Sequence, residues 1–336
     1  MTDYAMLDLV PVLQGGTIRD ALDRAADLAV HAEATGYTRY WVAEHHGMAG
    51  IASAATSLVI GHVGQATRTI RIGAGGIMLP NHAPLVIAEQ FGTLDALYPG
   101  RIDLGLGRAP GSDQQVARAL RRTLDSDPQA FPRDVMELQS YFADDGETGI
   151  QAIPGAGAKP EMWILGSSLF GAQLAAALGL PYAFASHFAP AMMDEAIETY
   201  RRNFRPSPVL EKPHLMLGYN VFAAETDEDA ELLATSAQQM FVAIRTTGKG
   251  IQLPPPVPGY RDTLGRQENA VLDSVLACSA TGGPETVARD IAAFVERTGA
   301  DELMFVSSIH DHEARKRSFA IAADAMRART SEPAAQ

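Results

Sequence analysis

Two histidines and a glutamate offer the clearest chemistry in the sequence, as Glu44-His45-His46 at the end of a predicted strand over residues 40–43. A histidine at such a position can accept or donate a proton near neutral pH. Adjacent side chains on an extended chain point in opposite directions, so His45 and His46 do not face one site together. No H-x-H or H-E-x-x-H spacing accompanies them, and we expect no bound metal. The segment is interpreted as catalytic or substrate-binding, with structural hydrogen bonding and metal ligation as the alternatives.

Glycines gather at the end of the next predicted strand, in Gly73-Ala74-Gly75-Gly76. Glycine weakens a strand interior, so this cluster indicates either the close approach of a flat ligand or a bulge. One strand later, Arg108 follows Gly105-Leu106-Gly107. An arginine beside glycines suits a phosphate through charge-assisted bonds, and a surface salt bridge is the alternative.

A second anion-binding signal follows the fifth predicted strand, where Ser167 and Ser168 precede a predicted helix. Free backbone N–H groups and hydroxyls at a helix start bind anions, although an ordinary helix cap has the same sequence pattern. Together with Arg108, the pair indicates the phosphate of a cofactor tail. The sequence contains no G-x-x-x-x-G-K-[ST] loop for a nucleoside triphosphate. His187, after the sixth predicted strand, is placed to line the same pocket.

Strands and helices that would position these residues alternate along the chain. Predicted strands cover residues 7–12, 40–43, 70–79, 101–106, 162–165, 182–185, 215–223 and 302–306. Predicted helices cover residues 18–35, 52–66, 85–97, 170–178, 191–203, 227–246 and 311–328, with a polar helical region ending near residue 145. About eight such units predict an α/β fold, a closed (β/α)8 TIM barrel with insertions. A doubly wound sheet is the alternative, but the G-x-G-x-x-G fingerprint is missing after the first strand.

The predicted organisation is one domain over residues 1–330 and a flexible tail over 331–336. Two segments interrupt the alternation, near 146–160 and 247–283, and we interpret both as insertions. The second contains Pro254-Pro255-Pro256, which excludes a helix or a central strand there. Sequence alone leaves open whether this segment covers the site or is a surface excursion.

Composition excludes several classes of function. The formal charge of −13 argues against general nucleic-acid binding, which requires a basic surface. No apolar run reaches the roughly 20 residues of a membrane span. Cys278 is the single cysteine, which excludes an internal disulfide and fits a cytoplasmic protein.

Four stretches, at residues 40–46, 72–80, 83–90 and 98–108, together resemble the luciferase-like flavin-dependent monooxygenases, in particular the bacterial luciferase or alkanal monooxygenase branch. Weaker matches extend the resemblance over roughly residues 5–325. It implies that reduced FMN and dioxygen act at the barrel mouth as co-substrates, and that a small organic molecule is oxidised. A separate flavin reductase would supply the reduced FMN.

Site residues follow from the resemblance position by position. His45 matches the active-site histidine. Ala74, Gly75 and Gly76 match the segment beneath the flavin ring, where a non-prolyl cis bond often joins the two glycine positions. Arg108, Ser167 and Ser168 fall in the phosphate-binding region. Gly107 stands where luciferase has a reactive cysteine, and Ser167-Ser168 replaces an acidic-serine pair, which argues against light emission.

The resemblance also implies a homodimer that pairs through the helix predicted over residues 85–97. Small side chains at Ala88, Gly92 and Ala96 form a stripe that would permit close contact with another helix. Two other functions remain open at this stage. One is a deazaflavin-dependent dehydrogenase of the same superfamily, and the other is a non-catalytic flavin-binding protein.

Overall fold

The structure, a computed structural model, describes residues 2–108, 114–120, 130–143 and 149–331. Within them the strands are β1 (Asp3–Asp8), β2 (Arg39–Val42), β3 (Arg71–Met78), β4 (Ile102–Gly107), β5 (Glu161–Gly166), β6 (Tyr182–Phe184), β7 (Leu215–Ala223), β8 (Ser279–Gly282) and β9 (Glu302–Val306). The α-helices are α1 (Ile18–Ala34), α2 (Thr56–Ala66), α3 (Pro84–Leu97), α4 (Gln114–Leu120), α5 (Ala130–Ala143), α6 (Leu169–Leu178), α7 (Met193–Asn203), α8 (Asp227–Thr247), α9 (Arg266–Val275), α10 (Pro284–Thr298) and α11 (His312–Ser331). Three short 3-10 helices join them, η1 (Leu79–Asn81), η2 (Pro190–Met192) and η3 (Tyr260–Thr263).

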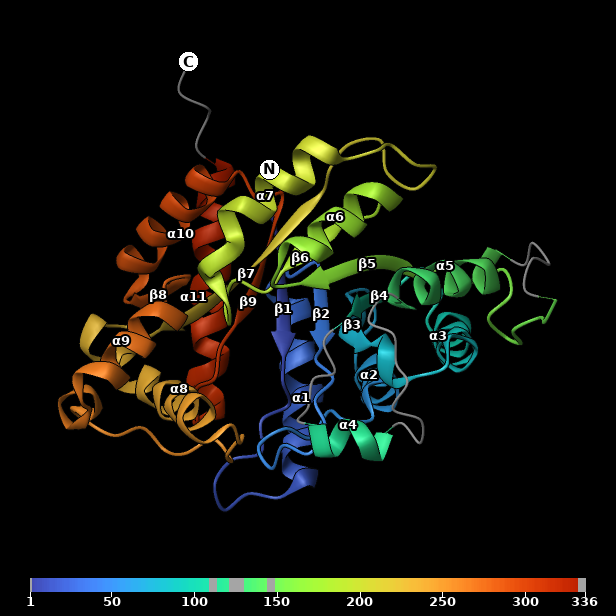
Figure 1. Cartoon of the computed structure of the whole chain (residues 1–336). Coiled ribbons are helices and arrows are strands. Elements are labelled where there is room, and N and C mark those ends of the chain that lie inside the picture. The colour runs from blue at the N-terminus through green and yellow to red at the C-terminus, as the bar shows by residue number, and fades with distance from the viewer. Residues whose placement is uncertain (1, 109–113, 121–129, 144–148, 332–336) are drawn as a thin grey trace.

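The strands form a closed parallel barrel, which confirms the predicted fold. The strand order is β6-β5-β4-β3-β2-β1-β9-β7, and pairing of β6 with β7 closes the ring. Helices surround the strands, as Figure 1 shows. Every strand therefore delivers its C-terminal end to the same side of the barrel, where the loops that follow the strands meet.

One strand lies outside the ring. β8 pairs with the C-terminal half of β7, from Asn220 to Ala223, so β9 is the eighth barrel strand. The sequence analysis interpreted residues 247–283 as an insertion, and it did not predict the elements α9 and β8 within that segment. Helix α10 was not predicted either. Figure 1 shows α8 and α9 as a lobe beside the barrel.

The first strand was predicted over residues 7–12, but β1 ends at Asp8. The reason is local. The Asp8 carboxylate accepts a hydrogen bond from the Val10 N–H at 2.9 Å, and Val10 has a φ of 50°. Positive φ is rare for a β-branched residue and turns the chain out of the strand. The apolar residues after Asp8 therefore belong to a buried loop.

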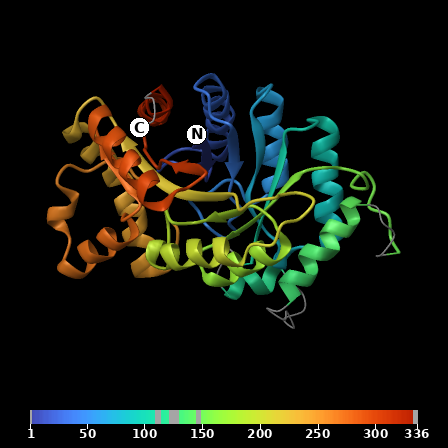
Figure 2. The same cartoon turned by 90° about the horizontal axis from the view of Figure 1, so that it is seen from above.

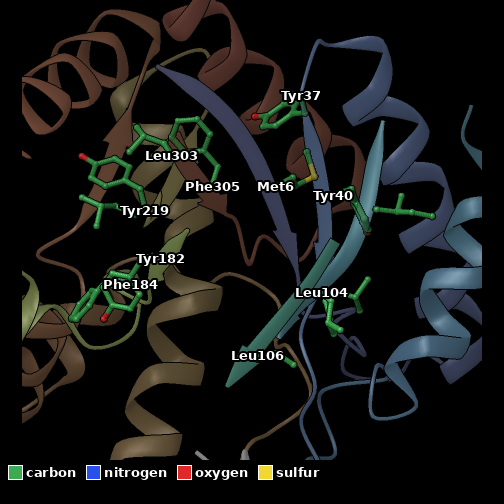
Figure 3. Packing of buried hydrophobic residues seen from close by; sticks show 14 of the residues in the cluster. Met6, Tyr37, Tyr40, Leu104, Leu106, Tyr182, Phe184, Tyr219, Leu303 and Phe305 are labelled. Atoms are coloured by element: carbon green, nitrogen blue, oxygen red, sulfur yellow. The ribbon is translucent and has the colours of Figure 1, made fainter. Parts of the chain in front are cut away.

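Two apolar layers hold the barrel together. Inside the ring, Trp41 and Trp163 pack edge to face with their ring centres 5.3 Å apart. Outside it, alternate strand residues pack against the helices, because successive side chains on a strand point to opposite faces. Figure 3 shows part of this outer layer, with Tyr219 and Phe305 on one side of the barrel and Tyr40 on another.

Charged residues close the barrel at the N-terminal ends of the strands. Arg39 contacts the carboxylates of Asp103, Glu161 and Glu302 at 2.9, 2.9 and 3.1 Å. Asp103 also pairs with Arg71 and accepts the indole N–H of Trp41 at 2.8 Å. Burial alone would lower the pKa of Arg39, but the three carboxylates raise it above its usual value. The two arginines and the three carboxylates of this network are thus all paired with one another.

The last helix closes the ring of helices against the first. Figure 2 shows α11 beside α1. His31 on α1 bonds the Lys316 carbonyl at 2.9 Å, and His312 bonds Asp27 at 2.8 Å. Residues 332–336 of the predicted tail lie outside the described part of the chain. In the described residues no helix is long and apolar enough to cross a bilayer.

Candidate active site at the barrel mouth

The β2 exit places its two histidines on opposite sides, as the sequence predicted. His46 Nε2 lies 2.7 Å from a carboxylate oxygen of Glu44. His45 lies between them in the chain and is turned away from that contact, because Glu44 and His46 share one side of the extended segment. His45 Nδ1 is buried and has no hydrogen-bond partner among the described residues. His45 thus keeps its polar atoms free for another molecule.

Glu44 is the centre of a network that sequence reasoning missed. Its side chain is 1% exposed and also contacts His82 Nε2 at 2.9 and 3.0 Å and the Met78 N–H at 3.0 Å. Burial alone would raise the pKa of Glu44, but these hydrogen bonds and the charge of His82 lower it below its usual value. The carboxylate therefore stays ionised and ties the β2 exit to the segment after β3.

Glu44, His46 and His82 bring three possible metal-ligand atoms within 4.8 Å of one another. However, both imidazoles and a backbone N–H already bond the carboxylate directly. This pattern satisfies Glu44 without an ion, so we interpret the group as a hydrogen-bond network that positions the β2 exit.

The glycine cluster on β3 forms a bare, tightly enclosed piece of backbone. The peptide bond between Gly75 and Gly76 is cis. A side chain at Gly75 would meet Trp41 at 2.9 Å, and one at Gly76 would meet the Gly105 carbonyl at 2.6 Å. The side chain of Ala74 points instead into the outer core, so this residue can meet a ligand only through its backbone. The geometry fits a flat ligand on the backbone of the glycine pair.

Arg108 lies beside the start of α6, where the two serines are. Its guanidinium carbon stacks 4.2 Å from the ring centre of Phe170, the second residue of that helix. Ser168 is the N-cap, yet its hydroxyl makes no capping hydrogen bond. The first N–H groups of a helix lack partners within it and attract anions. A cation and an uncapped helix start thus meet here, and exposed Ser167 adjoins them.

His187 is the second imidazole at the mouth. Its Nδ1 is buried without a partner in the described structure and lies against Gly218, where a side chain would collide with it. Burial, reinforced by the nearby charge of His45, lowers the pKa of His187 to about 4. Burial also lowers the pKa of His45. Both imidazoles are therefore neutral at physiological pH, and the influence of His45 on the pKa of His187 indicates that the two rings lie near each other.

Two cavities differ in their relation to these residues. A cavity of about 50 Å³ at the barrel mouth, called the chamber below, is lined by Gly75, His187 and apolar side chains. A larger cavity of about 700 Å³ lies between α8, η3, α9 and β8, lined by acidic residues such as Glu228 and Asp262. The larger one shares none of the site residues, so size alone does not identify the active site.

The end of α8 and the residues just before the proline run contact loops on two sides of the mouth. At one end, Arg245 donates to the Phe188 carbonyl at 3.0 Å, in the loop after β6. At the other end, Leu253 exchanges backbone bonds of 2.9 Å with Val12 and Gln14, after β1, and Ile251 touches Gly50, after β2. Strands β6 and β2 lie on opposite sides of the ring. Residues 245–253 therefore reach from the loop after β6 to the loops after β1 and β2. The prolines follow this stretch, and the Pro255 carbonyl accepts a hydrogen bond from Gln239 on α8.

The structure brings most of the predicted site residues together at the strand C-termini. His45, the glycine pair and Arg108 come from adjacent strands β2, β3 and β4, and the serines follow β5. One prediction nearby was wrong. Gly92 does not offer a face for another subunit, because a side chain there would collide with the backbone of Pro154 and Gly155 in the same chain.

The barrel mouth thus combines bare glycine backbone, two buried imidazole nitrogens without partners among the described residues, and a cation beside a helix start. This arrangement suits an oxidoreductase. A family model described as luciferase-like monooxygenase matches residues 6–302. The chain belongs to this family.

Relatives support the same assignment. A luciferase-like monooxygenase of Escherichia coli strain K12 is 51% identical over 329 residues, covering 96% of this chain and 98% of the relative. An N-acetyl-S-alkylcysteine monooxygenase of Bacillus subtilis strain 168 is 35% identical over 251 residues, covering 73% of this chain and 75% of the relative. Among solved structures, apo-MsnO8 is 34% identical with a TM-score of 0.91, covering 97% of this chain and 99% of that chain.

More distant solved structures share the fold and differ in cofactor. The oxygenating constituent of 3,6-diketocamphane monooxygenase from Pseudomonas putida, in complex with FMN, has a TM-score of 0.72 at 18% identity, covering 96% of each chain. An F420-dependent secondary alcohol dehydrogenase has a TM-score of 0.72 at 16% identity, covering 96% of this chain and 98% of that chain.

Proposed function

We propose that this protein is a monooxygenase that uses reduced FMN and dioxygen to oxidise a small organic substrate. The observation that carries the proposal is the bare backbone at Gly75 and Gly76, which has no room for side chains. Gly75 shares a cavity with His187, whose buried Nδ1 has no partner among the described residues. When bound, reduced FMN supplies the electrons that activate dioxygen, so that one oxygen atom enters the substrate.

The residues present fit such a cofactor. The glycine pair would support the flat ring, with only backbone contribution from Ala74. Arg108 and the α6 start at Ser167 and Ser168 would hold the phosphate. His45 would hold a proton or donate a hydrogen bond at the reacting end, and its burial keeps it neutral until it does so. Residues 245–253 would exclude water from the mouth.

A thioether is the first substrate to test. The name of the Bacillus subtilis relative indicates that it acts on N-acetyl-S-alkylcysteines. This chain shares more than a third of its residues with that enzyme over the aligned region, so an N-acetyl-S-alkylcysteine is a reasoned trial substrate.

Anaerobic titration of the apo-protein tests the cofactor. Reduced FMN and reduced deazaflavin are titrated separately, and the complex is then exposed to ¹⁸O₂ with the trial thioether. We expect reduced FMN to bind and ¹⁸O to appear in the product. Preferential binding of deazaflavin with hydride transfer would contradict the proposal, as would flavin binding without any oxygenation. His45→Ala should bind FMN and lose oxygenation, whereas His46→Ala should retain more of it.

Arg108→Ala tests the phosphate site. Loss of a charge-assisted bond should weaken FMN binding by roughly 1.5–3 kcal/mol. Riboflavin, which lacks the phosphate, should bind wild type and variant equally. A variant with unchanged FMN affinity would remove Arg108 from the site.

A separate flavin reductase is proposed as the source of reduced FMN, because the sequence lacks a G-x-G-x-x-G dinucleotide loop. Addition of NADH and FMN without a reductase should therefore give no product. Product formation in that mixture would show that the protein reduces its own flavin.

We also propose a homodimer through α2 and α3. Leu58, Val86 and Leu97 on these two neighbouring helices are 75%, 43% and 62% exposed, and burial of such side chains by a second copy would stabilise a dimer. Sedimentation should give about twice the 35.8 kDa chain mass. Leu97→Glu should split the dimer, whereas Val209→Glu, which alters an equally exposed residue (62%) between α7 and β7, should not. A wild type that sediments as a monomer at micromolar concentration would contradict the proposal.

A further inference from the structure

The chamber has properties that neither the flavin nor the organic substrate explains. Its volume is about 50 Å³. Sites for cofactors and drug-sized ligands usually occupy about 300–1,000 Å³, while one water molecule takes about 30 Å³ in the liquid. The chamber is therefore sized for a very small molecule.

The wall of the chamber is almost entirely apolar. It includes Leu7, Trp41, Met216 and Met304, from four different strands of the barrel. The indole N–H of Trp41 already bonds Asp103 and offers nothing to the cavity. His187 is the remaining polar side chain in the lining, and its pKa of about 4 keeps it neutral.

Water would be held poorly in this space. A buried water typically makes two to four hydrogen bonds. Two carbonyl groups of the lining already accept hydrogen bonds, because Ser186 N–H donates to the Phe184 carbonyl at 2.9 Å and Ser186 Oγ donates to the Gly218 carbonyl at 2.6 Å. His187 alone would be left as a partner. Cavities of this kind stay dry and accept small apolar molecules.

The position of the chamber connects it to the reaction. Gly75 belongs both to the chamber wall and to the cis pair that would support the flavin ring. Among the reactants of the proposed function, which this argument presupposes, dioxygen alone is both small and apolar. We propose that the chamber binds dioxygen beside the flavin and that His187 forms its one polar wall.

Xenon tests the cavity without any flavin. Crystals of the apo-protein under xenon pressure should show an atom bounded by Leu7, Met216 and Met304. Met304→Ala should increase the xenon occupancy, and Ala183→Val, which narrows the chamber, should reduce it. Ala280→Val is the matched control, because Ala280 is a buried strand alanine outside the barrel interior. Xenon absent from the chamber of the wild type, or ordered water in its place, would overturn the proposal.

Oxygen kinetics test the assignment to dioxygen. Each protein is loaded with reduced FMN and mixed with dioxygen at several concentrations in a stopped-flow instrument. Ala183→Val should lower the second-order rate constant for dioxygen by about tenfold, as expected for losing the burial of two apolar atoms. The FMN affinity of Ala183→Val should not change. The control Ala280→Val should react with dioxygen at the wild-type rate.

Three outcomes are distinguishable. If Ala183→Val excludes xenon but reacts with dioxygen at the wild-type rate, the chamber does not hold dioxygen. If Ala183→Val does not fold, Met304→Ala replaces it. A Met304→Ala protein that binds more xenon but reacts with dioxygen at the wild-type rate would equally overturn the proposal. If reduced FMN in the wild type oxidises as it does free in solution, the proposed function fails, and the assignment of the chamber to dioxygen fails with it.

Discussion

Replacing Glu44 by glutamine removes the charge of a buried carboxylate while keeping its shape. In the native chain this carboxylate contacts His46 at 2.7 Å, His82 at 2.9 Å and the Met78 N–H at 3.0 Å. Hydrogen bonds to charged groups contribute about 1.5–3 kcal/mol and neutral ones about 0.5–1.5 kcal/mol. Weakening the two histidine contacts should therefore cost roughly 2–3 kcal/mol. For a chain of this size we expect Tm to fall by roughly 3–5 °C.

The assay is thermal unfolding across a pH series, with Glu296→Gln as the control, because Glu296 is exposed. The pKa of Glu44 is lowered in the folded state, so its stabilisation is complete above the unfolded pKa of about 4.5 and is lost as the pH falls through the folded value. The difference between wild type and Glu44→Gln should thus persist at neutral pH and shrink in acid. If the Tm of Glu44→Gln lies within about 1 °C of that of the wild type at neutral pH, the ionised Glu44 network does not stabilise the fold as argued.

Arg39→Met should lower the free energy of unfolding in urea by roughly 3–5 kcal/mol, because it leaves buried carboxylates without their cation. Its FMN affinity should not change, and an unaltered urea midpoint would contradict this prediction. Gly92→Ala should cost roughly 1–3 kcal/mol by forcing a side chain against the backbone of Pro154 and Gly155, whereas Gly61→Ala, where a side chain meets only ordinary contacts, should be neutral or stabilising. NMR titration should find His187 neutral down to a pKa of about 4, whereas a signal that titrates near 6.5 would disprove its burial. Because the unfolded chain protonates first, at about 6.5, His187 should make stability fall as the pH drops from there toward 4.

Local patterns in the sequence predicted the barrel well because each strand and helix has its own apolar period. The strand predicted over 215–223 and the helix start at Ile18 match the structure. The first strand was misplaced because the conformation of Val10 depends on a hydrogen bond to the Asp8 side chain. Apolar character alone does not distinguish a strand from a buried loop.

The candidate site was predictable where it depends on strand alternation and not where it depends on contacts between distant segments. The opposite directions of the His45 and His46 side chains follow from the alternation of successive side chains along an extended chain. The bond between Glu44 and His82 joins residues 38 positions apart, and no local pattern encodes it. The same is true of the backbone bond between Leu253 and Val12, which joins the segment after α8 to the loop after β1. A histidine shortly after the third strand was the available signal for His82.

Buried polar groups differ in their hydrogen bonding between the two ends of the barrel. At the N-terminal ends of the strands, Arg39 has a carboxylate partner for each side of its guanidinium, and buried Asp103 is bonded by two arginines and a tryptophan. At the C-terminal ends, His45 and His187 each leave a buried nitrogen unpaired in the described structure. Unpaired buried polar groups cost free energy, so a fold retains them where a ligand completes the bonds. Substitutions in the Arg39 network should therefore change stability and spare FMN binding, while those of His45 and His187 should change binding or turnover and leave Tm nearly constant.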